Sequence, residues 1–149
     1  MNQQVQTMKR DAELYNYIYQ NARMGVVGIN QIRASVTDAA LTKELCDQYA
    51  LYDEYSTTAE NALRELGEEA KDIGVAAKAG SFISSKFNTT VDSSVSHIAA
   101  MMIEGTTIGV TKLSQKISAM QDCSPEVIDL ATRLVGVESG AIESLKKFL

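Results

Sequence analysis

Proline occurs only once in this chain of 149 residues, at position 125. Because proline interrupts helices and is common in loops, its near absence favours long helices that are joined by short turns. The chain also has no tryptophan and only 6% aromatic residues, which disfavours a β-sandwich. We therefore expect an all-α fold.

The first half of the chain has two segments with the apolar period of a helix face. In the first, over residues 11–35, apolar and small residues recur at steps of three and four. Thr37 and Asp38 then provide N-cap side chains for a second helix, which we expect to end near Lys71. Its polar face is rich in charged residues, as expected for a face in contact with water.

The second half of the chain contains two further helical segments. Asp92 or Ser93 is the expected cap of the third helix, and residues 75–91 before it suggest a short extra helix, either separate or continuous with the third. The last helix has the clearest start, because Ser124 suits the N-cap and Pro125 suits the first helical position.

Four amphipathic helices with mostly short loops predict a single domain, residues 1–149, with the fold of a four-helix bundle. The longer connection between the second and third helices is compatible with a crossover, as in ferritin-like bundles. We predict a ferritin-like up-down four-helix bundle with a short extra helix before the third long helix.

Charge and hydropathy exclude several classes of partner. The net charge of −5 argues against nucleic acid as the main partner, because phosphate binding needs a basic surface. No run of eighteen apolar residues is present, so no membrane span is expected. The N-terminus lacks the apolar core of a signal peptide, and Cys46 and Cys123 have neither CxxC spacing nor histidine neighbours. We expect a cytoplasmic protein with reduced thiols.

The acidic and histidine residues argue against a di-metal centre. Such a centre in a bundle needs two Glu-x-x-His motifs, whereas His97 is the only histidine and Ser94 stands three residues before it. Glu104 and Glu138 lie near the middle of their helices, where an inward orientation would form a small polar site with His97. We expect no metal or cofactor. A mononuclear metal site or an acid–base pair is the alternative, and a structural His97 is the simpler interpretation.

No motif for nucleophilic catalysis is present. The chain contains no GxSxG, P-loop or GxGxxG sequence, and no cysteine pairs locally with a histidine. Enzyme activity is therefore poorly supported.

Six glycines interrupt the helical segments, and each costs about 1 kcal/mol relative to alanine within a helix. A face of small residues allows two helices to approach closely, within the chain or between copies of it. We predict helix packing within the chain, and we leave a ligand groove as the least favoured alternative. These glycines are Gly25, Gly28, Gly105, Gly109, Gly136 and Gly140.

Tyrosines and methionines add two further candidate surfaces. All six tyrosines lie in the first two helical segments, where their rings suit an interface. Met101 and Met102 lie beside the glycine face of the third helix, where we expect core positions in preference to an adaptable binding surface.

One sequence segment resembles a known family. Residues 88–111, NTTVDSSVSHIAAMMIEGTTIGVT, are similar to the Ser-His-Ile-Ala-Glu-Met-Met-Ile-Gln-Gly pattern of small uncharacterised ferritin-like proteins of clostridia and related Firmicutes. The run YQNARMGVVGI and the pattern of the last helix are similar as well, so the resemblance spans nearly the whole chain. It implies a ferritin-like bundle, but Ala100 and Glu104 replace the expected Glu and Gln. It implies no catalytic residues, since none are established for the family.

The best-supported function is that of a non-catalytic interaction or structural protein. We expect it to form a homo-oligomer, or to bind another protein, through a tyrosine- or glycine-rich helix face. A metal-binding or redox protein that uses His97 and Glu104 is the first alternative, and an assembly or export chaperone is the second.

Overall fold

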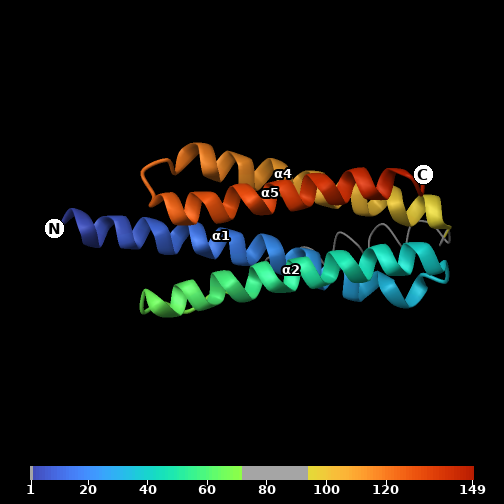
Figure 1. Ribbon diagram of the computed structural model, residues 1–149, viewed down its shortest axis with the longest axis horizontal. Coiled ribbons are helices and arrows are strands. Elements are labelled where there is room, and N and C mark those ends of the chain that lie inside the picture. Colours follow the sequence, from blue (N-terminus) through green and yellow to red (C-terminus); the bar gives the residue numbers. More distant parts are fainter. Residues whose placement is uncertain (1, 72–93) are drawn as a thin grey trace.

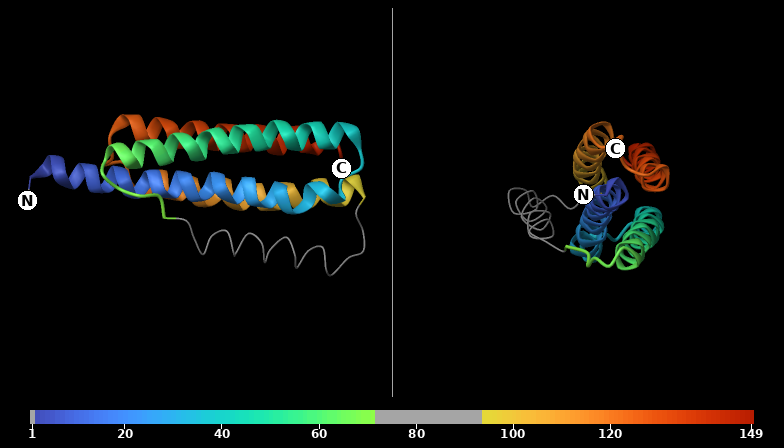
Figure 2. Two further views of the ribbon diagram at one scale, coloured as in Figure 1. Left: turned by 90° about the horizontal axis from the view of Figure 1, so that it is seen from below. Right: turned by 90° about the vertical axis from the view of Figure 1, so that its left-hand side faces the viewer.

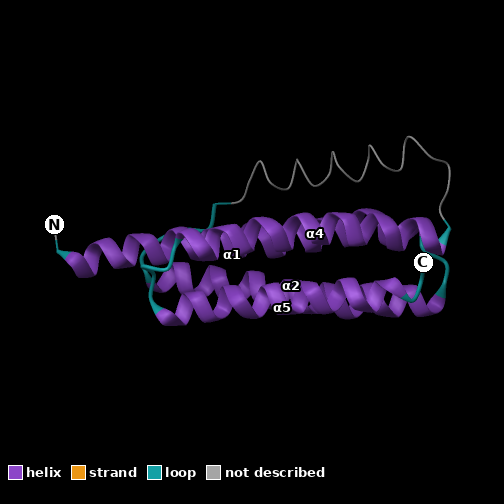
Figure 3. Ribbon diagram, turned by 90° about the horizontal axis from the view of Figure 1, so that it is seen from above, coloured by secondary structure: helices purple, strands orange, loops and turns teal. Residues whose placement is uncertain are grey.

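The computed structural model describes residues 2–71 and 94–149, and within them it contains helices and no strands, as Figures 1 and 3 show. The prediction of an all-α chain is confirmed for this part. The short extra helix expected within residues 75–91 lies outside the described residues. The four long helices are α1 (Gln3–Ile32), α2 (Ala39–Glu65), α4 (Val95–Ala119) and α5 (Pro125–Lys146), and a 3-10 turn, η1 (Arg33–Ser35), follows α1.

The four helices form a bundle of two antiparallel pairs. Helix α1 packs mainly against α2, and α4 packs mainly against α5. Helices α2 and α4 run in the same direction and lie at opposite corners of the bundle (Figures 1 and 2). Consecutive helices therefore do not simply alternate in direction, as a strict up-down order would require. Helix α2 ends and α4 begins at opposite ends of the bundle (Figures 1 and 2).

The ends of the first two helices differ from the predicted positions. Helix α1 begins at Gln3 and not near Asp11, because the Asn2 side chain accepts a hydrogen bond from the Gln4 backbone N–H and caps the helix. This N-terminal part projects beyond the other helices (Figure 1). It has no neighbouring helix within the described residues to pack against, so its sequence lacks the apolar stripe that would have revealed it. Helix α2 ends at Glu65 and not near Lys71, because Gly67 adopts a left-handed conformation with φ of 76°.

Side-chain caps explain where α2 and α4 begin. The Asp38 carboxylate accepts from the Leu41 N–H at 2.9 Å, which confirms the predicted cap of α2. Helix α4 is capped by Ser94, whose hydroxyl oxygen accepts from the His97 N–H at 3.3 Å. The cap expected at position 92 or 93 was therefore placed too early.

The start of α5 is stabilised by a residue from α1. Ser124 and Pro125 hold the predicted N-cap and first helical positions, but Ser124 makes no side-chain bond to its own helix. Its N–H donates to Asp11 Oδ1 at 2.8 Å, and its hydroxyl donates to Asp11 Oδ2. The neighbouring Arg10 donates to Asp122 at 2.9 Å. These bonds tie α1 to the turn between α4 and α5.

The core lies along the predicted apolar faces of the helices. It also contains three of the tyrosines, Tyr15, Tyr19 and Tyr52, so their rings pack inside the chain and do not form an outer surface. No helix of the described residues is long and apolar enough to cross a membrane. The largest fully buried side chains are Leu14, Ile18, Val26, Ile29, Ile32, Leu41, Leu45, Leu63, Ile98, Leu113, Leu134 and Leu145.

Candidate functional site

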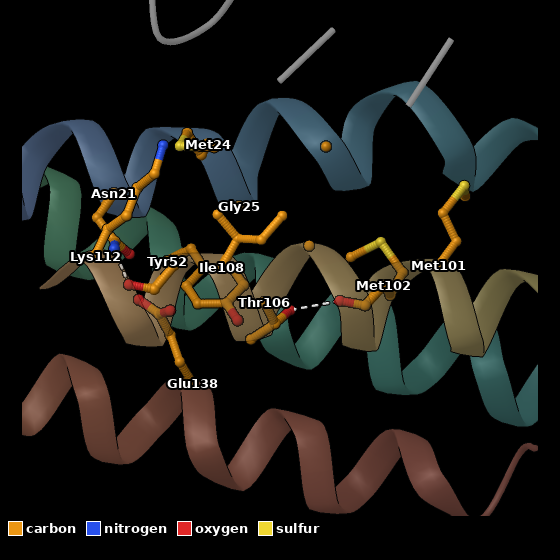
Figure 4. A pocket seen from close by; sticks show the side chains of 13 residues that line it. Asn21, Met24, Gly25, Tyr52, Met101, Met102, Thr106, Ile108, Lys112 and Glu138 are labelled. Carbon is orange, nitrogen blue, oxygen red and sulfur yellow. Dashed lines mark hydrogen bonds between the residues drawn. The ribbon is translucent and has the colours of Figure 1, made fainter. Parts of the chain in front are cut away.

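A cavity of about 200 Å³ lies mainly between α1 and α4, and the exposed residues Ile108 and Lys112 form part of its wall (Figure 4). Most of its wall comes from α1 and α4, whereas α2 contributes Tyr52 and α5 contributes Glu138. All four helices therefore meet at this one place, although they are far apart in sequence. The lining residues are Asn21, Met24, Gly25, Gly28, Tyr52, Met101, Met102, Gly105, Thr106, Ile108, Gly109, Lys112 and Glu138.

Glycines on α1 and α4 make room for side chains from the opposite helices. A Cβ atom on Gly25 would lie 2.4 Å from Cδ2 of the Tyr52 ring, and one on Gly109 would lie 2.7 Å from Oε2 of Glu138. Both distances are shorter than any ordinary van der Waals contact. The absence of a side chain at Gly25 and Gly109 therefore leaves the space that Tyr52 and Glu138 occupy. Both glycines also line the cavity.

The two glycines of α5 do not share this role. Gly136 and Gly140 are exposed, and a Cβ atom on either would meet nothing within 4 Å. The predicted packing of these two glycines against another helix of the chain is therefore wrong. The helical period places them on the outer face of α5, away from the buried Leu134 and Glu138.

Glu138 is the central polar group of the cavity. Its side chain comes from α5 toward α4 (Figure 4), and the residue is only 2% exposed. Its Oε1 atom is buried and has no hydrogen-bond partner among the described residues. Burial in these apolar surroundings disfavours the ionised form and raises the pKa of Glu138 from 4.5 to about 8. The Glu138 carboxyl group is therefore mostly neutral at pH 7.

The other polar side chains around the cavity have specific roles. Asn21 donates from Nδ2 to the carbonyl oxygen of Gly109 at 3.0 Å, and Thr106 donates to the carbonyl oxygen of Met102 at 2.7 Å. Burial raises the pKa of Tyr52 above its ordinary value, and the nearby Glu138 carboxyl adds to this rise. Tyr52 therefore remains a neutral phenol.

The three residues of the predicted polar site are not brought together. His97 is half-buried in the first turn of α4, Glu104 is exposed on the same helix, and neither lines the cavity that contains Glu138. Within residues 2–71 and 94–149, no three His, Cys, Asp or Glu side chains are grouped so that they would hold a metal ion. Successive residues of a helix point in different directions, so Glu104 is exposed although its neighbour Gly105 lines the cavity.

Sequence reasoning overlooked the residues that complete the site. Tyr52 was considered only among the six tyrosines expected at an interface, and Asn21 and Lys112 were not singled out. A usable signal was present in Asn21 and Gly25, which place a polar and a small residue on the apolar side of α1. Their partners come from other helices, so the cavity itself has no local sequence pattern.

Comparison with known proteins identifies no relative: no family model, no curated protein and no solved structure matches this chain. The resemblance to a clostridial ferritin-like family therefore stays a prediction. The functional argument rests on the geometry and chemistry of the cavity.

Proposed function

We propose that this protein is a non-catalytic binding protein that holds a small molecule in the central cavity of its helical bundle. The observation that carries this proposal is Glu138, a carboxyl group that is 2% exposed and presents an unpaired oxygen at a cavity of about 200 Å³. Ligand sites are typically concave and mostly apolar, with a few polar groups that orient the ligand. The cavity has this composition.

The energetic cost of the site supports a binding role. A buried polar atom without a partner costs about 1–3 kcal/mol, and an apolar side chain at position 138 would avoid that cost. Each glycine within a helix lowers the stability of the folded state by about 1 kcal/mol relative to alanine. A ligand that supplies a hydrogen bond to Glu138 and fills the cavity offsets both costs, since it binds the folded state alone.

Binding is better supported than catalysis. The described lining residues include no histidine, cysteine or serine; the Thr106 hydroxyl is used on the Met102 carbonyl oxygen, and the Lys112 side chain is exposed at the edge. The metal-binding alternative with His97 and Glu104 gains no support, because neither residue lines the cavity. Self-association and chaperone activity stay predictions from the sequence.

We also propose that the bundle is ferritin-like. The support is the direction of the helices: they form two antiparallel pairs, and α2 ends at the end of the bundle opposite to the one where α4 begins (Figure 2). In bundles of this type, ligand and cofactor sites are built in the core from side chains on facing helices. The position of Glu138 and Tyr52 on α5 and α2 is consistent with such a site.

A fragment screen with two tryptophan variants tests the binding function. Ile108→Trp enlarges a side chain of the cavity wall, and the matched control Thr107→Trp adds the same ring at the adjacent exposed position outside it. We expect some small fragments to raise the melting temperature of the wild type and of Thr107→Trp, but not that of Ile108→Trp. The proposal fails if no fragment binds the wild type, or if Ile108→Trp binds the same fragments equally well.

A further inference from the structure

We propose that the ligand of this cavity is a small primary amine, whose ammonium group donates hydrogen bonds to Glu138 while its apolar body fills the rest of the space. This inference rests on the proposed binding function and names its ligand class. It follows from the hydrogen-bonding capacity, the charge and the size of the site.

The acceptor that the cavity offers to a ligand is a carboxylate oxygen of Glu138, while Tyr52 shares a side-chain hydrogen bond with Thr106 and the proton of neutral Glu138 is lost when the group ionises. Glu138 Oε1 has no hydrogen-bond partner within the part of the chain that the structure describes. Asn21 uses a donor of its amide on Gly109, and Thr106 uses its only hydroxyl proton on Met102. A matching ligand therefore brings donors, and an ammonium group carries three of them without any acceptor.

The distribution of charge favours a cation over an anion. Glu138 is buried at the cavity, whereas the positively charged Lys112 is exposed at its edge, where water screens it. A ligand carboxylate and Glu138 could not both ionise side by side without like-charge repulsion, and a purely apolar ligand would leave Oε1 unpaired. The net charge of −5 of the whole chain also attracts a cation.

The remaining wall requires an apolar ligand body. Met24, Met101 and Met102 contribute flexible thioether chains, and Tyr52 contributes an aromatic ring near Ile108 (Figure 4). A cavity of 150 Å³ holds benzene, so about 200 Å³ accommodates on the order of six to ten non-hydrogen atoms. A short alkyl or cycloalkyl amine has this size.

The protonation of Glu138 agrees with this assignment. The buried carboxyl group holds its proton at neutral pH, since burial raises its pKa to about 8. A bound ammonium group favours the carboxylate, so an ion pair replaces the neutral acid when the amine enters. The lost proton leaves to solvent, which provides a second signature of binding besides affinity.

The test compares cyclohexylmethylamine with its neutral analogue cyclohexylmethanol by calorimetry at pH 7. Charge-assisted hydrogen bonds contribute about 1.5–3 kcal/mol, so we expect the amine to bind wild-type protein at least about tenfold more tightly than the alcohol. Glu138→Gln, which keeps the shape of the neutral side chain, should remove that preference. Glu54→Gln, which removes an exposed carboxyl group from α2, is the matched control and should retain it.

A second arm identifies the source of the amine. Butylamine and the Nα-acetyl, N-methylamide derivative of lysine carry the same four-carbon ammonium chain, as a free amine and as a residue of a peptide. Binding of butylamine alone indicates a free metabolite-sized amine. Binding of both, with the lysine derivative the tighter, indicates a lysine side chain of a partner protein.

The outcomes separate the two proposals. The amine assignment is overturned if the alcohol binds wild-type protein as tightly as the amine, a comparison that needs no variant to fold. It is also overturned if a folded Glu138→Gln protein retains the amine preference. If neutral fragments bind and Ile108→Trp excludes them, the binding function stands without the amine. If no compound binds wild-type protein, both proposals fail.

Discussion

Replacement of Glu138 by glutamine should change how the stability of this protein depends on pH. In the folded protein the pKa of Glu138 is about 8, because the carboxyl group is buried, whereas the ordinary value is 4.5. Between these two values the folded chain keeps the proton that the unfolded chain releases. Stability therefore falls as pH rises through this interval, since the unfolded state binds fewer protons than the native state.

The magnitude follows from the interval between the two pKa values. Each pKa unit corresponds to about 1.36 kcal/mol, so the interval from 4.5 to about 8 predicts a loss of about 5 kcal/mol in the free energy of unfolding. The full contribution of the neutral group is present below pH 4.5 and is lost above about pH 8. Glutamine has a similar shape and no proton to lose, so Glu138→Gln should escape this loss.

Urea denaturation followed by circular dichroism measures the effect. We expect the difference in free energy of unfolding between Glu138→Gln and wild type to be small at pH 4.5 and to grow by about 1.4 kcal/mol per pH unit up to about pH 8. Tyr52 and Lys112, the other titratable residues described along the cavity, are present in both proteins, so their effects largely cancel in the difference. A pH-independent difference would refute the reasoning, because it would mean that Glu138 ionises in the fold as it does in water.

Three further predictions concern the packing and capping of the bundle. Gly25→Ala should destabilise by about 1–3 kcal/mol because its Cβ meets an aromatic ring, whereas Gly136→Ala, in open space, should stabilise by about 0.4–1 kcal/mol; opposite signs in urea titrations are the expected result. Asp11→Ala should lower stability by about 1–3 kcal/mol, measured by thermal melting, since it removes the acceptor for the start of α5; an unchanged melting temperature would contradict this. Exposed Cys46 should react with a disulfide reagent at pH 8 well before Cys123, whose burial raises the thiol pKa to about 11; equal labelling rates by mass spectrometry would argue against it.

Sequence alone was sufficient for the local features of this fold. The three- and four-residue spacing of apolar side chains identified the buried faces of the helices, and the cap at Asp38 was correct because its bond depends on residues within one turn. Ser124 holds the predicted N-cap position, but its side chain bonds to Asp11 and not to its own helix. Helix ends without such a strong signal were misplaced. The N-terminal part of α1 has no core to contact and so lacks a stripe, and α2 ends early because of the conformation of Gly67.

The tertiary structure alone decided which residues form the site. The local sequence predicted an inward orientation for Glu104 and for Glu138 alike. Packing leaves Glu104 exposed and buries Glu138 among residues of all four helices. The same holds for Asp11, which caps a helix that begins more than a hundred residues later. A helical period determines which residues share a face, but the neighbours of that face depend on the direction and pairing of the other helices. The sequence therefore determined an all-helical chain with its apolar faces, and the assembly of those faces determined the cavity and the environment of Glu138.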